Sequence, residues 1–209
     1  MKILATIVVG AALAAAATAA PLATTLTLTA TPTTVTYGKA VALSGVLSTH
    51  RANQTVKVAG TECGTNAAKG VANVKTNATG AYTTSVTTIV NTTYQASQKN
   101  TKSPTVVVSV KPVLKLVRAS RGSYTVSVTS ALDLKGKTIL FQRYSKTRKR
   151  WVQVKKVVLA TTTPGTKPTV VSSAAFKAKV ALRVRVRAAL SKAQAAPCYV
   201  AATSNSVRA

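Results

Sequence analysis

Only two side chains in this 209-residue sequence carry a carboxyl group, Glu62 and Asp133. Glycoside hydrolysis needs two carboxyl groups held close together, one acting as an acid and the other as a base or a nucleophile. Glu62 and Asp133 fall in different predicted domains, and Asp133 lies in a predicted turn before Gly136. The sequence therefore argues against a glycoside hydrolase.

The single histidine, His50, and Cys63 are the other candidates for a catalytic pair, with Glu62 next to the cysteine. No recognisable motif places a third residue to orient the histidine, so we interpret the two as a loop histidine and a structural cysteine. The same side chains lack the paired spacing of a zinc site. Gly60 and Gly64 lack the following helix that a phosphate-binding loop has. We expect no catalytic residue, no metal and no cofactor.

The N-terminal segment has the layout of a secretory signal peptide. Met1 and Lys2 give a positive start, an apolar run covers residues 3–17, and the small-residue site Ala17-Thr18-Ala19 follows. We expect a signal peptide over residues 1–19. The alternative is a membrane anchor, but no positively charged stop follows the run. No later segment approaches the ~20 apolar residues of a membrane-spanning helix, so we expect the mature chain to be secreted, either extracellular or associated with the cell surface.

The two cysteines, Cys63 and Cys198, fall in different predicted domains. In an oxidising compartment three outcomes compete: a disulfide between the domains, a disulfide between chains, or two free thiols. We favour the interdomain disulfide, because closing a loop of 134 intervening residues adds up to about 5 kcal/mol in the chain-entropy model. It requires the two Cα atoms to approach within about 7 Å, which would place Cys63 at the domain junction.

The chain is strongly and unevenly basic. Its formal net charge is +27, and 21 of its 29 lysine and arginine residues lie from Lys111 onward. Such a field attracts polyanions over a Debye length of ~8 Å at physiological salt. Outside a cell the available polyanions are wall polymers, acidic polysaccharide, anionic lipid headgroups and released nucleic acid.

One basic cluster lies in the loop of a predicted hairpin. Alternating residues on both sides, over 139–144 and 151–158, predict two strands. Phe141 and Trp151 are expected to belong to the core. The loop Ser145–Arg150 holds four candidate polyanion-binding residues, Lys146, Arg148, Lys149 and Arg150. In isolation the cluster is also typical of a nucleic-acid or nuclear-import signal.

Apolar and basic residues alternate over Lys179–Arg187, and this pattern predicts a strand with a second basic cluster on one face. A strand there would turn Val180, Leu182, Val184 and Val186 one way and Lys179, Arg183, Arg185 and Arg187 the other. Successive arginines would then lie about 6.6 to 6.8 Å apart, and Arg183, Arg185 and Arg187 could bind anionic groups along a polymer. The alternative is a solvated face whose charges discourage strand pairing at the sheet edge.

The rest of the mature chain has the rhythm of short strands separated by turns. Further strands are expected over Thr25–Thr29, Val41–Leu47, Thr55–Ala59, Val71–Lys75, Ala81–Thr88, Thr93–Ser97 and Thr105–Val110. Their spacing of about 8 to 15 residues is typical of an antiparallel sandwich. Only Ser173–Ala178 and Ala188–Ala196 are Ala-rich enough for a short helix. We expect one domain over residues 24–111, closed by Pro112, and a second over 112–209 that repeats its logic.

Particular turn and core residues carry a resemblance to a known family. They are Thr79-Gly80-Ala81-Tyr82, Thr92-Thr93-Tyr94-Gln95-Ala96 and Ser103-Pro104-Thr105-Val106 in the first domain, and Gly136-Lys137, Gln142-Arg143, Trp151, Phe176, Leu182-Arg183 and Ser204-Asn205-Ser206-Val207 in the second. The chain resembles the bacterial immunoglobulin-like repeats of actinobacterial secreted and surface proteins. The resemblance implies an all-β fold of two tandem immunoglobulin-like antiparallel β-sandwich domains. It implies structural, adhesive or carbohydrate-associated accessory roles and transfers no catalytic residue.

Two functions of different class follow. The first is a secreted non-catalytic protein, adhesive or structural at the cell envelope, that binds an anionic polymer or polysaccharide through its cationic second domain. The second is extracellular nucleic-acid binding. For nucleic acid the charge is sufficient, but only Tyr144 and Trp151 flank the basic loop, and no series of base-stacking aromatic residues follows.

Overall fold

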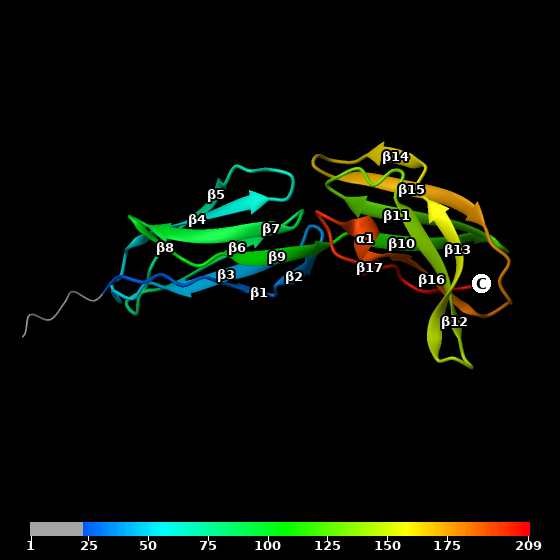
Figure 1. Ribbon diagram of the computed structural model, residues 1–209, viewed down its shortest axis with the longest axis horizontal. Coiled ribbons are helices and arrows are strands. Elements are labelled where there is room, and N and C mark those ends of the chain that lie inside the picture. The colour runs from blue at the N-terminus through cyan, green and yellow to red at the C-terminus, as the bar shows by residue number, and fades with distance from the viewer. Residues whose placement is uncertain (1–22) are drawn as a thin grey trace, which may run out of the picture.

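The computed structural model describes residues 23–209, and the predicted signal peptide over 1–19 lies outside these residues. The described chain is a β-sandwich fold, as expected, with one short helix, α1 (Lys192–Ala195). Figure 1 shows two groups of sheets lying end to end along the long axis. Within residues 23–209 no helix is long and apolar enough to cross a membrane.

The N-terminal half, up to Lys111, contains two facing sheets. The smaller has the order β1 (Thr29–Thr31), β3 (Ala40–Val46), β6 (Ala81–Thr87). The larger has the order β2 (Thr34–Thr36), β9 (Val106–Lys111), β7 (Thr92–Gln98), β4 (Thr55–Glu62), β5 (Lys69–Lys75), and β8 (Thr101–Lys102) also pairs with β7. All pairs are antiparallel except β2 with β9. Alternate apolar residues such as Leu43, Val58 and Val108 are fully buried between the sheets, which is the reason these segments form strands.

The C-terminal half repeats this construction. One sheet has the order β10 (Val113–Ser120), β11 (Ser123–Ser130), β15 (Val170–Lys177), β14 (Thr161–Pro164). The other has the order β13 (Arg150–Val158), β12 (Thr138–Ser145), β16 (Arg185–Leu190), with β17 (Ala202–Thr203) and β18 (Val207–Arg208) both pairing with β16. The buried rings of Tyr124 and Phe141 belong to this core, and the partly buried ring of Phe176 packs against them, with centroids 4.8 to 5.8 Å apart.

The central strands of the sheets have the same order in the two halves. β3 lies between β1 and β6 as β11 lies between β10 and β15, and β4 lies between β5 and β7 as β12 lies between β13 and β16. An internal duplication predicts this correspondence. In the part of the chain that the structure describes, no strand of one half pairs with a strand of the other.

The halves meet through a short, hydrogen-bonded junction. Cys63 and Cys198 form a disulfide across it, with Cα atoms 5.2 Å apart. The backbone N–H of Val200 donates to the carbonyl of Val110 (2.9 Å), and the backbone N–H of Asn91 donates to the carbonyl of Cys198 (2.9 Å). Of the three outcomes considered for the cysteines, the structure has the disulfide between the halves.

The predicted strand over Lys179–Arg187 is wrong. Residues 178–184 form a loop and turn, Leu182 is 56% exposed instead of buried, and Arg183 adopts a left-handed backbone with φ of 63°. The N–H of Arg183 donates to the carbonyl of Ala209 (3.1 Å), so this turn is held by the C-terminus. Strand β16 begins only at Arg185, and its pairing with β12 begins at Val186.

Two smaller expectations also need correction, and a third is confirmed. The segment Thr25–Thr29 enters a strand only at Thr29, although Leu26 forms an isolated bridge to Leu47. The Ala-rich segment Ser173–Ala178 belongs almost entirely to strand β15, which pairs with β11. The other Ala-rich segment does contain the helix, whose N-terminus is capped by Ser191.

Candidate polyanion-binding surface

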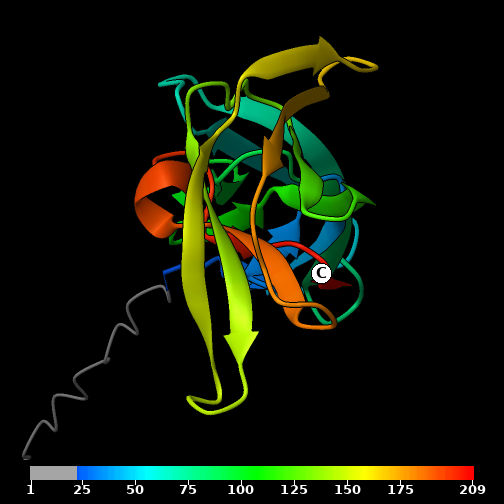
Figure 2. The ribbon, with the colours of Figure 1, turned by 90° about the vertical axis from the view of Figure 1, so that its right-hand side faces the viewer.

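The basic loop lies at the tip of the predicted hairpin. β12 and β13 pair from Thr138 with Val158 to Ser145 with Arg150, which confirms both strands, and Figure 2 shows the hairpin projecting beyond the rest of the half. All four candidate cations, Lys146, Arg148, Lys149 and Arg150, are exposed. Lys149 lies in the left-handed region with φ of 47°, and the Arg148 N–H donates to Ser145 Oγ (3.2 Å). These two features reverse the chain direction within a short loop, so its four positive charges lie close together.

The second group of cations adjoins the hairpin on one face of the same sheet. The guanidinium carbon of Arg185 lies 4.8 Å from the centre of the Tyr144 ring, and that of Arg187 lies 4.3 Å from the centre of the Trp151 ring. The two rings meet edge to face, with centroids 5.5 Å apart. Arg187 Nε donates to Gln142 Oε1 (2.9 Å). We call these five residues the arginine–aromatic face.

Strand register explains why these side chains meet. Tyr144 pairs with Trp151 across β12 and β13, and Gln142 pairs with Arg187 across β12 and β16. Because side chains alternate along a strand, all of them lie on the face opposite the buried Phe141. The expectation that Phe141 belongs to the core is confirmed, since it is 0% exposed. The same expectation for Trp151 is wrong, because the ring is half-buried on the outer face and covered by Arg187.

Of the three arginines predicted to form a ladder, the structure brings two onto the arginine–aromatic face. Arg183 lies in the preceding turn and is not part of this strand. The sequence interpretation missed Arg208, which pairs directly with Arg185 across β16 and β18. Like charges placed directly opposite on two strands are unfavourable, and an anion bound between Arg185 and Arg208 would relieve that repulsion.

No side-chain carboxylate in the sequence is positioned to neutralise this surface. Glu62 lies on β4 in the other half. Asp133 accepts hydrogen bonds from the Thr162 hydroxyl (2.6 Å), the Lys135 N–H (2.8 Å) and the Ser172 hydroxyl (3.0 Å). Partial burial lowers the pKa of Arg187, but a guanidinium keeps its charge throughout the physiological range. No side-chain carboxylate therefore balances the positive charge of this surface.

The structure gives other bonding partners to Cys63 and His50, the two residues considered for catalysis. The sulfur of Cys63 is bonded to Cys198 and cannot act as a thiolate nucleophile. His50 Nδ1 is 2.9 Å from the carbonyl oxygen of Thr79, in a loop of the N-terminal half. Over residues 23–209, no group of three or more histidine, cysteine, aspartate and glutamate side chains is close enough to hold a metal ion.

Sequence comparisons supply no relative for this chain. No protein-family model matches it, and no curated protein sequence matches it.

Proposed function

We propose that this chain is a secreted, non-catalytic protein that binds an anionic polymer of the cell envelope through its C-terminal half, in an adhesive or structural role. Secretion rests on the N-terminal segment, and an oxidising compartment is consistent with the disulfide. The observation that carries the proposal is the arginine–aromatic face beside the basic loop, without carboxylates to balance either. The guanidinium groups of Arg185 and Arg187 already lie over aromatic rings, so less side-chain entropy is lost when they bind an anion.

The immunoglobulin-like part of the proposal is supported by the strand order. In the N-terminal half, the sheet with the order β1–β3–β6 faces a sheet in which β4 pairs with β5 on one side and with β7 on the other. In the C-terminal half, the sheet containing β10–β11–β15 faces a sheet in which β12 pairs in the same way with β13 and β16. Immunoglobulin-type sandwiches distribute their strands between two sheets in this way. We infer two tandem immunoglobulin-like domains over residues 24–111 and 112–209.

Extracellular nucleic-acid binding is the alternative, and the geometry favours it less. Binding of single strands depends on aromatic faces on which bases stack. The two aromatic residues of the surface, Tyr144 and Trp151, each already have a guanidinium over the ring. A base could stack on that side only by displacing Arg185 or Arg187.

Salt-dependent binding of the mature chain to purified envelope polymer tests the proposal. The logarithm of the affinity should fall steeply with the logarithm of the salt concentration. Replacing Arg185 and Arg187 by alanine, or the four loop cations by glutamine, should lower the affinity by about tenfold or more, because charge-assisted hydrogen bonds are lost.

Matched controls separate a site from overall charge. Lys57 and Lys75 are exposed on β4 and β5 of the other half, and replacing both by alanine removes the same charge as the arginine pair. Replacing Lys57, Lys69, Lys75 and Lys102, all exposed, by glutamine matches the loop variant. Binding that is unchanged by salt, or that responds equally to control and site variants, contradicts the proposal. Tighter binding to single-stranded DNA than to envelope polymer would favour the alternative.

A further inference from the structure

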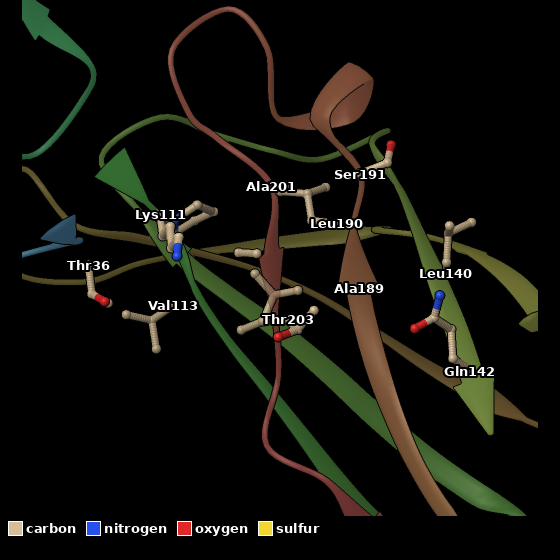
Figure 3. A pocket seen from close by; sticks show the side chains of 13 residues that line it. Thr36, Lys111, Val113, Leu140, Gln142, Ala189, Leu190, Ser191, Ala201 and Thr203 are labelled. Atoms are coloured by element: carbon tan, nitrogen blue, oxygen red, sulfur yellow. The ribbon is translucent and has the colours of Figure 1, made fainter. Parts of the chain in front are cut away.

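A pocket of about 580 Å³ lies at the junction of the two halves and is lined from both of them (Figure 3). Thr36 and Lys111 come from the N-terminal half, and Val113, Leu140, Ala189 and Thr203 come from strands of the C-terminal half. Its volume falls within the range of about 300 to 1,000 Å³ that is usual for ligand sites. We call it the junction pocket.

The walls of the junction pocket are held in a fixed relation. Val113 follows directly on the Lys111–Pro112 link, and Ala201 to Thr203 follow Val200, whose N–H donates to the carbonyl of Val110 (2.9 Å). The disulfide of Cys198 anchors the same segment to the N-terminal half. A site built from both halves is therefore preorganised for a ligand, which reduces the entropic cost of binding.

The lining combines apolar carbon with short polar groups. Figure 3 shows Ala189 and Thr203 between Thr36 and Lys111 on one side and Leu140 and Gln142 on the other. Hydroxyls of Thr36, Ser191 and Thr203 and the amide of Gln142 accompany this apolar surface. A sugar ring has the matching chemistry, with apolar C–H faces and hydroxyl groups at its edge. The described lining contains no aromatic side chain, so it offers no platform for a nucleic-acid base.

Among the described residues, Lys111 is the one cation in the lining of the pocket. On the other side Gln142 accepts a hydrogen bond from Nε of Arg187 (2.9 Å), which lies next to the lining and is not part of it. That bond occupies Nε and leaves the two terminal nitrogens of Arg187 available for an anion. Gln142 therefore belongs both to the lining of the junction pocket and to the arginine–aromatic face.

We propose that the junction pocket holds sugar rings of an acidic polysaccharide, whose acidic groups pair with Lys111 and Arg187. The inference rests on the proposed function, because it names the class of the anionic polymer. A polymer without sugar rings, such as polyphosphate, would satisfy the arginines but gain nothing from the apolar lining.

Calorimetric titration with an oligogalacturonate and with polyphosphate of similar charge tests the inference. Thr203→Leu and Ala189→Leu each fill the pocket without changing charge, and Thr203 is exposed, so its variant should fold even if the other does not. Thr55→Leu, at an exposed position of β4, is the matched control. We expect the two leucine variants to weaken oligogalacturonate binding about tenfold, because the sugar ring can no longer bury its apolar face in the pocket. Lys111→Gln should weaken it by a similar factor, because an ion pair is lost. Thr55→Leu should leave the affinity unchanged. Polyphosphate binding should be insensitive to the two leucine substitutions.

The outcomes separate this inference from the proposed function. If Arg185→Ala with Arg187→Ala weakens binding of both polymers but the pocket variants leave oligogalacturonate affinity unchanged, the pocket inference is overturned and the proposed function stands. Absence of oligogalacturonate binding, or equal sensitivity of polyphosphate to the leucine variants, also overturns it. If neither polymer nor purified envelope polymer binds in a salt-dependent way, the proposed function itself fails.

Discussion

The guanidinium of Arg187 covers the ring of Trp151, with 4.3 Å between the guanidinium carbon and the ring centre. Trp151 is the only tryptophan of the chain, so tryptophan emission reports on the surroundings of this one ring. Arg187→Ala should expose the ring to water and shift its emission to longer wavelength. The lost cation–π contact should lower the free energy of unfolding by about 0.5 to 1 kcal/mol.

The same signal should report ligand binding. Addition of anionic polymer at low salt should change Trp151 emission in the unaltered protein and leave it unchanged in Arg187→Ala. Lys75→Ala serves as a control, because Lys75 is exposed on β5 of the N-terminal half and lies outside the arginine–aromatic face. Identical spectra for the protein and Arg187→Ala would contradict the assigned geometry.

Asn91 connects the two halves through its side chain. Its Nδ2 donates to the carbonyl of Pro197 (2.9 Å), and its Oδ1 accepts from the N–H of Val110 (2.8 Å). Val110 is 0% exposed, so Asn91→Ala leaves a buried N–H without that partner. We expect the free energy of unfolding to fall by about 1 to 3 kcal/mol, measured by urea denaturation. Asn73→Ala, at an exposed position of β5, should have a much smaller effect, and equal effects would contradict the role of Asn91.

The disulfide between Cys63 and Cys198 is the covalent link of the junction apart from the chain itself. Replacing both cysteines by serine should lower the free energy of unfolding by up to about 5 kcal/mol. Because no described strand pairs across the halves, we also expect the two halves of this variant to unfold in separable transitions. Urea denaturation with and without reductant measures both effects, and the double variant should not respond to reductant. Two titratable thiols in the native protein would disprove the link.

Much of this fold follows from local pattern in the sequence. Ile139 and Phe141 alternate with polar or partly exposed neighbours, and the turn before them begins at Gly136, so both the strand and its buried face could be predicted. The cysteine pair could be anticipated because only one geometry, a shared junction, brings Cys63 and Cys198 together within a monomer. The first inference depends on the two-residue period of strand residues, and the second depends on where the two cysteines lie along the chain.

The errors arise where a long-range partner decides the outcome. Alternation from Val180 to Val186 continues in the sequence, but the hydrogen bond from Arg183 to Ala209 makes part of it a turn. Alternation over residues 151–158 predicts a core position for Trp151, yet its face is set by pairing with Tyr144. Arg208 was missed because no local signal indicates that β18 pairs with β16. Register between distant segments is not encoded in either segment alone.

Asp133 gives the stability of this protein a defined dependence on acid. Hydrogen bonds from the hydroxyl of Thr162, the N–H of Lys135 and the hydroxyl of Ser172 hold the pKa of Asp133 below its ordinary value, which is about 3.9. The folded state therefore binds this proton less readily than the unfolded state. The contribution of Asp133 to stability is present above about pH 4 and is lost as the pH falls below that value through the pKa of the folded protein.

Because Asp133 is the only aspartate, its carboxyl carbon gives a single assignable NMR titration. Thr162→Val removes the hydrogen bond that lowers the pKa most and should shift the titration midpoint to higher pH. In urea denaturation between pH 2 and pH 6, Asp133→Asn should flatten the loss of stability below about pH 4. Glu62→Gln is the control, since Glu62 lacks these three donors. An unchanged midpoint in Thr162→Val, or the same acid dependence in Asp133→Asn as in the original chain, would show that the hydrogen-bonded carboxylate does not contribute to stability.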